Sequence, residues 1–264
     1  MAAHTFLFLE WNLISQAEYV VDSNIYLVSF QEDALLFDIG KKTDQEGTKH
    51  IDHPWHVYSN PEYPEMYPFL AMACHLICDP TILNVQCHLF EGSEQYERFN
   101  IIFLEIVGHP KYRQRFIALG MPSEDFGTHS IRKGAVTFVA TECTACPPIA
   151  SIYLRVNLAM PGVMNRYIKY ESAGDQFTVK CVSGSSRMST EFAIIPVYFD
   201  FTSFGEAEME HNESRIDNWI KARMPLTSQS NEKVFGVFRM CVAALVYYDN
   251  FLKEHLHPME YSLR

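Results

Sequence analysis

A histidine and an arginine three residues apart are the side chains of this sequence whose types and spacing could do chemistry. His129 and Arg132 stand in the run His-Ser-Ile-Arg-Lys, and on a helix they share one face. A guanidinium there can hold two oxygens of a phosphate, and an imidazole beside it can donate a hydrogen bond or move a proton. Tyr167 follows downstream, where its hydroxyl could attack phosphorus and divide one displacement into two reversible steps. The pattern points to cleavage and rejoining of a nucleic-acid backbone.

A lysine could supply the remaining proton transfer. Lys42 stands in the polar, charged run 41–50 between two expected strands. A lysine on such a hairpin tip can reach into a site and protonate a leaving alkoxide. Lys41 is a close alternative to Lys42, and Tyr170 is the rival of Tyr167 as nucleophile.

The chemistry predicted from these residues needs neither a metal nor a cofactor. Cations of the protein would offset the negative charge that develops in the transition state. Cys143 and Cys146 have the spacing of zinc ligands, but no second pair accompanies them at a familiar distance, so no zinc site is expected.

The elements expected to position these residues are mostly helices. Apolar periodicity predicts helices over residues 6–21, 65–78, 94–107, 114–119, 129–141, 147–158, 161–170, 214–222 and 233–255. Thr128 is the expected N-cap of the helix that carries His129 and Arg132. Residues 34–40 and 55–58 predict the two strands of a β-hairpin with a long polar tip. Residues 172–189, rich in Ser and Gly, predict a loop or extended arm.

Length and composition indicate an ordered globular chain. It has 264 residues, of which 48% are hydrophobic, with only 12 Gly and 13 Pro. We therefore expect a mainly α fold with a small β-sheet (α+β), with one domain over residues 1–200 and a C-terminal helical extension over 201–264. The seven scattered cysteines suit a reducing compartment, and neither a signal peptide nor a membrane span is expected.

Charge favours one local surface for a polyanion. The chain has a net charge of −11, which taken globally argues against nucleic acid as a partner. Residues 129–170, however, contain five basic residues and one acid. Apart from Arg132, the basic residues of this window are candidate contacts to a DNA backbone: Lys133, Arg155, Arg166 and Lys169. The alternative is that they are a solvated helix surface.

Four runs of the sequence resemble the catalytic domain of tyrosine recombinases (phage-integrase-like proteins), and most closely those of Crypton-type eukaryotic mobile elements. The runs cover residues 127–134, 152–155, 160–170 and 171–176, and residues 42–47 and 56–61 are also similar to that group. The resemblance implies a mostly helical catalytic domain with a small sheet. It also implies the catalytic residues: Tyr167 as nucleophile, Arg132 and His129 stabilising the phosphorane, and Lys42 protonating the 5′ oxygen.

Two positions depart from the family pattern. The family uses a further arginine on the helix before the hairpin, where this chain has Gln16, and the first arginine of the chain is Arg98. The family also has His or Trp nine residues before the nucleophile, where this chain has Leu158. Lost contacts to the transition state of this kind typically cost about 3 kcal/mol or more. The N-terminal DNA-clamping domain that the family carries is not expected in this sequence.

The predicted function is DNA recombination or integration through a phosphotyrosine intermediate, impaired by the two departures. The alternative is a catalytically inactive, domesticated recombinase remnant that binds DNA or a protein without cutting. A third interpretation is an unrelated helical scaffold. The expected partners are DNA and, on DNA, other copies of the chain, with no membrane, and the expected location is nuclear or cytoplasmic rather than secreted.

Overall fold

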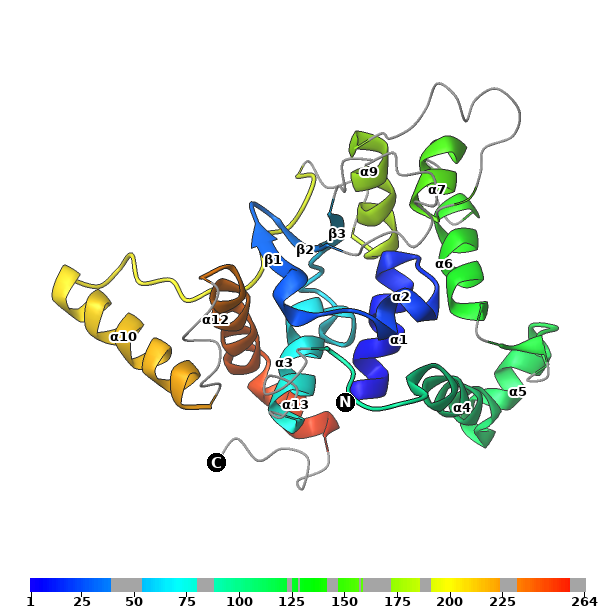
Figure 1. Cartoon of the computed structure of the whole chain (residues 1–264), viewed down its shortest axis with the longest axis horizontal. Coiled ribbons are helices and arrows are strands. Elements are labelled where there is room, and N and C mark those ends of the chain that lie inside the picture. The colour runs from blue at the N-terminus through cyan, green and yellow to red at the C-terminus, as the bar shows by residue number, and fades with distance from the viewer. Residues whose placement is uncertain are drawn as a thin grey trace. The chain divides into compact units, whose positions relative to one another are not determined.

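The computed structural model describes residues 1–38, 54–79, 88–122, 125–127, 129–141, 147–156, 158, 172–185, 191–223 and 232–256. Over these residues the chain is mainly helical with a small antiparallel sheet, which confirms the predicted fold class (Figure 1). The chain divides into two compact units, each made of stretches that are distant in sequence. Met1, Asn24–Leu89 and Ala193–Arg264 form one, the sheet unit, and Ala2–Ser23 and Phe90–Phe192 form the other, the helical unit.

The sheet unit contains three strands in the order β1-β2-β3, all antiparallel. β2 (Ala34–Phe37) pairs with β3 (Trp55–Tyr58) in the register Ala34↔Tyr58, which confirms the predicted hairpin. β1 (Val28–Gln31) pairs with the other edge of β2 and was not predicted from the sequence. All four residues of β2 are buried, as expected for the central strand.

The turn between β1 and β2 contains a strained residue. Glu32 has a φ of 55°, in the left-handed region, whereas the other turn residue, Asp33, does not have a positive φ. A left-handed conformation costs a residue with a Cβ atom about 1–2 kcal/mol and costs glycine nothing. We expect Glu32→Gly to be more stable than Asp33→Gly by about 1 kcal/mol, because only the first substitution relieves strain while both loosen the unfolded chain. Urea unfolding of the two variants measures this difference, and equal stabilities would contradict it.

Helices cover the sheet and complete the core of this unit. They are η1 (Ile25–Leu27), η2 (Pro64–Met66), α3 (Pro68–Cys78), α10 (Glu206–Arg223), α12 (Glu232–Tyr247) and α13 (Asp249–His255). α12 packs against α3 and β1, burying Val237, Phe238 and Cys241 on its inner face (Figure 1).

The helix predicted over residues 233–255 is interrupted at Tyr248. This residue separates α12 from α13, and its hydroxyl donates a hydrogen bond to the carbonyl of Pro61 at 2.9 Å. No single helix among the described residues is long and apolar enough to span a bilayer. α12 and α13 reach that length and composition only together, and they are bent by 67°.

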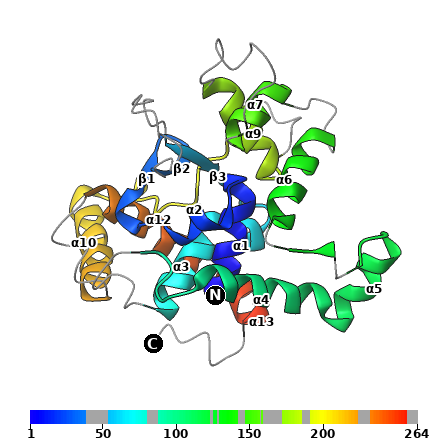
Figure 2. The same cartoon turned by 45° about the vertical axis from the view of Figure 1, so that its right-hand side comes forward.

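The helical unit is built around α1. Its helices are α1 (Ala2–Leu13), α2 (Ala17–Val21), α4 (Gln95–Gly108), α5 (Pro110–Ala118), α6 (Ser130–Thr141), α7 (Ile149–Arg155) and α9 (Ser172–Val182). α1 packs against α2, α4, α6 and α9, and Figure 2 shows it beside α4 and α6. Phe6 of α1 stacks on Phe99 of α4 with ring centroids 4.2 Å apart. Trp11 lies against Phe138 of α6 and donates a hydrogen bond to the carbonyl of Val182 at 3.1 Å.

Two sequence predictions for this unit were wrong. The single helix over residues 6–21 is two helices, because Ile14 has a φ of 50° and Gln16 is the extended N-cap residue of α2. The loop or arm over residues 172–189 contains the helix α9. Thr178 and Val179 are fully buried there, and the Thr178 hydroxyl donates to the carbonyl of Gly174, so tertiary packing outweighs the Ser- and Gly-rich composition.

Candidate functional site

The start of α6 presents His129 and Lys133 to solvent. The carbonyl of His129 accepts a hydrogen bond from the backbone N–H of Lys133 at 2.9 Å, so His129 immediately precedes α6 and Arg132 lies in the first turn of that helix. The Ser130 hydroxyl accepts from the backbone N–H of Gly127 at 2.9 Å, which fixes the chain entering the helix. His129 is exposed and takes no part in the core. The expected N-cap, Thr128, lies outside the described residues.

Arg132 points partly into the unit rather than fully into solvent. Its side chain is half-buried, and Nη2 donates a hydrogen bond to the backbone carbonyl of Val156, at the end of α7. Burial lowers the pKa of the Arg132 guanidinium, and Tyr19 of α2 and Glu10 of α1 act in the opposite direction. Arginine nevertheless stays protonated in proteins, so Arg132 is a fixed positive charge with one of its donors already in use.

A carboxyl group, Glu10, acts electrostatically on Arg132. Glu10 is only 2% exposed, and among the described residues no donor lies within hydrogen-bond distance of its Oε1 atom. Burial raises the pKa of the Glu10 carboxyl to about 8, although the positive charge of Arg132 lowers it in part. A buried carboxyl without a full set of partners is expected to keep its proton. The electrostatic neighbour of Arg132 on α1 is therefore an acid.

Arg155 does not fit the surface position expected for a DNA contact. It is 2% exposed, and its Nη1 atom lies 3.1 Å from Asp175 Oδ2 in an ion pair between α7 and α9. Its Nη2 atom donates to the backbone carbonyl of Asn12, at 3.3 Å. The guanidinium thus joins three helices of the unit. The sequence pattern could not separate this internal role from a surface one.

The two departures from the family pattern occupy distinct local settings. Gln16 is the N-cap residue of α2, with extended backbone and no capping hydrogen bond from its side chain. Leu158 is 54% exposed, and its backbone N–H donates to the carbonyl of Tyr153. Neither side chain can supply the cation or ring donor that the resemblance implies at its position.

The remaining predicted site residues all fall outside the described part of the chain. These are Lys42, Tyr167, Arg166 and Lys169, together with the alternatives Lys41 and Tyr170. The structure thus places His129, Arg132 and Lys133 at the start of α6 and leaves their relation to the nucleophile a prediction. Within the described ranges no group of three His, Cys, Asp or Glu residues could hold a metal ion. Cys143 and Cys146 lie outside those ranges.

Sequence reasoning missed Glu10. The available signal was a single carboxylate in the apolar run Phe6-Leu-Phe-Leu-Glu-Trp11, at a position that an amphipathic helix would bury.

Comparison with known proteins adds no relative: no family model, no curated protein and no solved structure matches the chain.

Proposed function

We propose that this protein is a tyrosine-recombinase-like protein that binds DNA and has lost most of its capacity to cut it. The observation that carries the proposal is the environment of Arg132. Its guanidinium already donates to the carbonyl of Val156, and the α1 side chain that acts electrostatically on it is the carboxyl of Glu10 rather than a second cation. During strand cleavage, further cations beside this arginine must offset the negative charge that develops on the phosphate, and an acid cannot do so.

The start of α6 supports the DNA-binding half of this function. His129 and Lys133 are exposed there, and the N-terminus of a twelve-residue helix adds partial positive charge. Such an end can hold a phosphate without specific side-chain geometry. Binding of this kind depends on charge and weakens steeply with salt.

The loss of cutting follows from the contacts that the transition state would lack. The resemblance implies an arginine where Gln16 stands and a ring donor where Leu158 stands. Removing one preorganised donor typically slows such a reaction about a hundredfold or more. With both missing, and with Arg132 beside Glu10, we expect DNA binding to survive and strand cleavage to fall below detection.

The test is a nicked suicide substrate of mixed sequence, in which cleavage traps the protein on DNA through a covalent bond. We expect no covalent adduct from the natural chain, together with DNA binding by fluorescence anisotropy that falls as salt rises. The variant Lys133→Gln should weaken DNA binding. It should also reduce the slope of log affinity against log salt by about one, because one fewer counterion is released on binding.

Two results would overturn the proposal. An adduct formed by the natural chain and abolished by Tyr167→Phe would show an active recombinase with Tyr167 as its nucleophile. Absence of both adduct and salt-sensitive DNA binding would remove DNA as the partner and leave the unrelated helical scaffold as the interpretation.

A further inference from the structure

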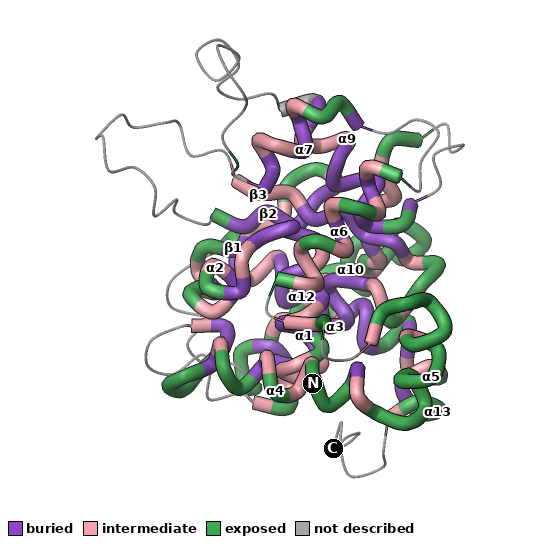
Figure 3. The backbone as a smooth tube through the Cα atoms, turned by 90° about the vertical axis from the view of Figure 1, so that its right-hand side faces the viewer, coloured by how far each residue is buried: buried purple, intermediate pink, exposed green. Residues whose placement is uncertain are grey.

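α5 is a basic helix that almost nothing in its unit covers. Every residue from His109 to Gly120 is exposed except Phe116, which is intermediate. Figure 3 draws this helix mainly in the colour of exposed residues. A nine-residue helix that buries no side chain gains little stability from packing. Packing against the core therefore does not explain which residues α5 exposes.

The charge on this helix has a single sign. Residues 109–122 contain Lys111, Arg113 and Arg115 and no acid, in a chain of net charge −11. Lys111 and Arg115 are four residues apart and share one helix face. The Lys111 ammonium also lies 5.3 Å from the centroid of the Tyr112 ring, which is 39% exposed. Cations beside an exposed aromatic ring are the combination that holds nucleic-acid backbone and bases.

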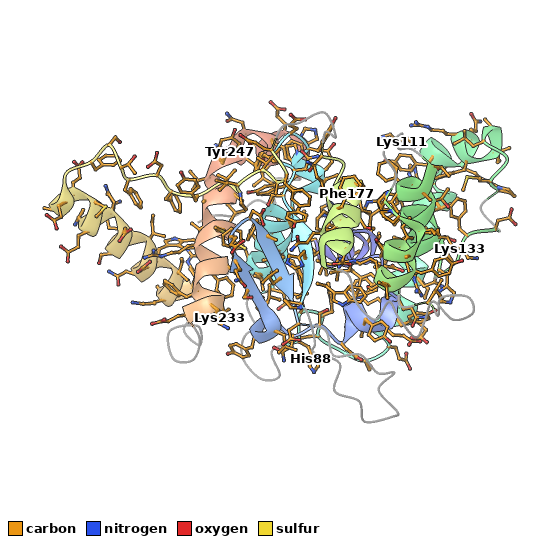
Figure 4. All side chains as sticks on the ribbon, turned by 90° about the horizontal axis from the view of Figure 1, so that it is seen from above. His88, Lys111, Lys133, Phe177, Lys233 and Tyr247 are labelled. Carbon is orange, nitrogen blue, oxygen red and sulfur yellow. The ribbon has the colours of Figure 1, made fainter. Side chains whose placement is uncertain are left out.

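One aromatic contact ties α5 to the segment that leads into α6. Phe116 packs edge-on against Phe126, with ring centroids 5.0 Å apart, and Phe126 also contacts Phe103 of α4. Phe126 is three residues before His129. Both helices lie in the helical unit, and Figure 4 marks Lys111 on α5 and Lys133 on α6. Phe126 therefore anchors the basic helix to the chain that enters the candidate phosphate site.

We propose that α5 is a second contact surface for the DNA backbone, with Lys111, Arg113 and Arg115 neutralising phosphates next to those held at the start of α6. This inference rests on the proposed DNA-binding function and adds to it residues to which the family resemblance assigns no role. Tyr112 provides a face on which an unpaired base can stack. The exposed apolar residues Ile117 and Leu119 follow on the same segment.

The test removes three charges from α5 and compares the variant with one that loses three charges elsewhere. The first variant carries Lys111→Gln, Arg113→Gln and Arg115→Gln. The matched control carries Arg215→Gln, Lys221→Gln and Arg223→Gln on α10, whose three cations are also exposed. Binding to duplex and single-stranded DNA is measured by anisotropy over a range of salt, and circular dichroism checks that each variant is folded.

We expect the α5 variant to bind DNA about tenfold or more weakly at low salt, and its slope of log affinity against log salt to fall by about two to three. The control should keep the slope of the natural chain. If the natural chain binds DNA but the two variants behave alike, α5 is not a contact surface and the proposed function still stands. If the natural chain does not bind DNA, both proposals fail.

A membrane surface is the other polyanion that could attract a basic helix with exposed apolar residues. Vesicles of phosphatidylserine and phosphatidylcholine provide the comparison. Loss of vesicle binding in the α5 variant, with DNA binding unchanged, would overturn the DNA assignment. Loss of DNA binding in that variant, with no vesicle binding by the natural chain, supports it.

Discussion

Asp175→Asn should lower the free energy of unfolding by about 3–5 kcal/mol, a cost typical of leaving one partner of a buried ion pair without its counter-charge. Arg155 is enclosed between α7, α9 and α1, with a side chain only 1% exposed, and Asp175 is the carboxylate that offsets its charge. Asparagine keeps the shape and removes only the charge. Urea unfolding followed by circular dichroism measures the change.

The matched control for this experiment is a more accessible ion pair in the sheet unit. Asp217 accepts from Arg239, and the side chains of the pair are 22% and 39% exposed, respectively. Asp217→Asn should cost no more than about 1 kcal/mol, because water replaces the lost contact. Similar costs for the two substitutions would mean that Arg155 is not buried as described.

Glu10→Gln should stabilise the protein increasingly as pH rises from about 5 to about 8. The pKa of Glu10 is raised from an ordinary 4.5 to about 8 in the folded chain, mainly by burial. Between these values the unfolded chain releases a proton that the folded chain retains, so the free energy of unfolding of the natural chain falls as pH rises. A glutamine cannot titrate and removes this loss.

The size of the Glu10 effect follows from the same equilibrium. Each tenfold displacement of a protonation equilibrium corresponds to about 1.4 kcal/mol, so the gain from Glu10→Gln reaches several kcal/mol near pH 8 and is small near pH 5. Glu18→Gln, which removes an exposed carboxyl from α2, is the control and should leave the pH dependence unchanged. A gain independent of pH in Glu10→Gln would show that titration of Glu10 is not the cause.

Elements with strong local signals were predictable from the sequence, and elements set by tertiary packing were not. The hairpin of β2 and β3 was found because Ala34-Leu-Leu-Phe37 is a short apolar run and Trp55–Tyr58 alternates. α9 was missed because Ser172, Gly174 and Ser183 to Ser185 favour turns, whereas the buried faces of Thr178 and Val179 decide its structure. The break between α1 and α2 depends on Ile14, which has a left-handed backbone conformation. β-Branched residues rarely adopt this conformation, so the sequence does not indicate the break.

The candidate site was predictable in its spacing and not in its surroundings. The three-residue separation of His129 and Arg132 places them within one helical turn, as the structure has them. No local pattern indicates that Arg132 would meet Glu10, which is 122 positions away in the chain, or that Arg155 would turn inward to Asp175. Such partners depend on which helices pack together, and that is a property of the folded unit.

The division of the chain into interleaved stretches has a consequence for its synthesis. α1 is made before the helices α4, α6 and α9 that it packs against, and the last of these ends only at Val182, so α1 leaves the ribosome long before those partners are complete. The sheet unit likewise lacks α12, which covers β1 and α3, until residue 247 has emerged. A nascent chain that exposes these apolar faces for so long is a natural client for chaperones, and neither unit can complete its fold before its last packing helix, α9 or α12, has been translated.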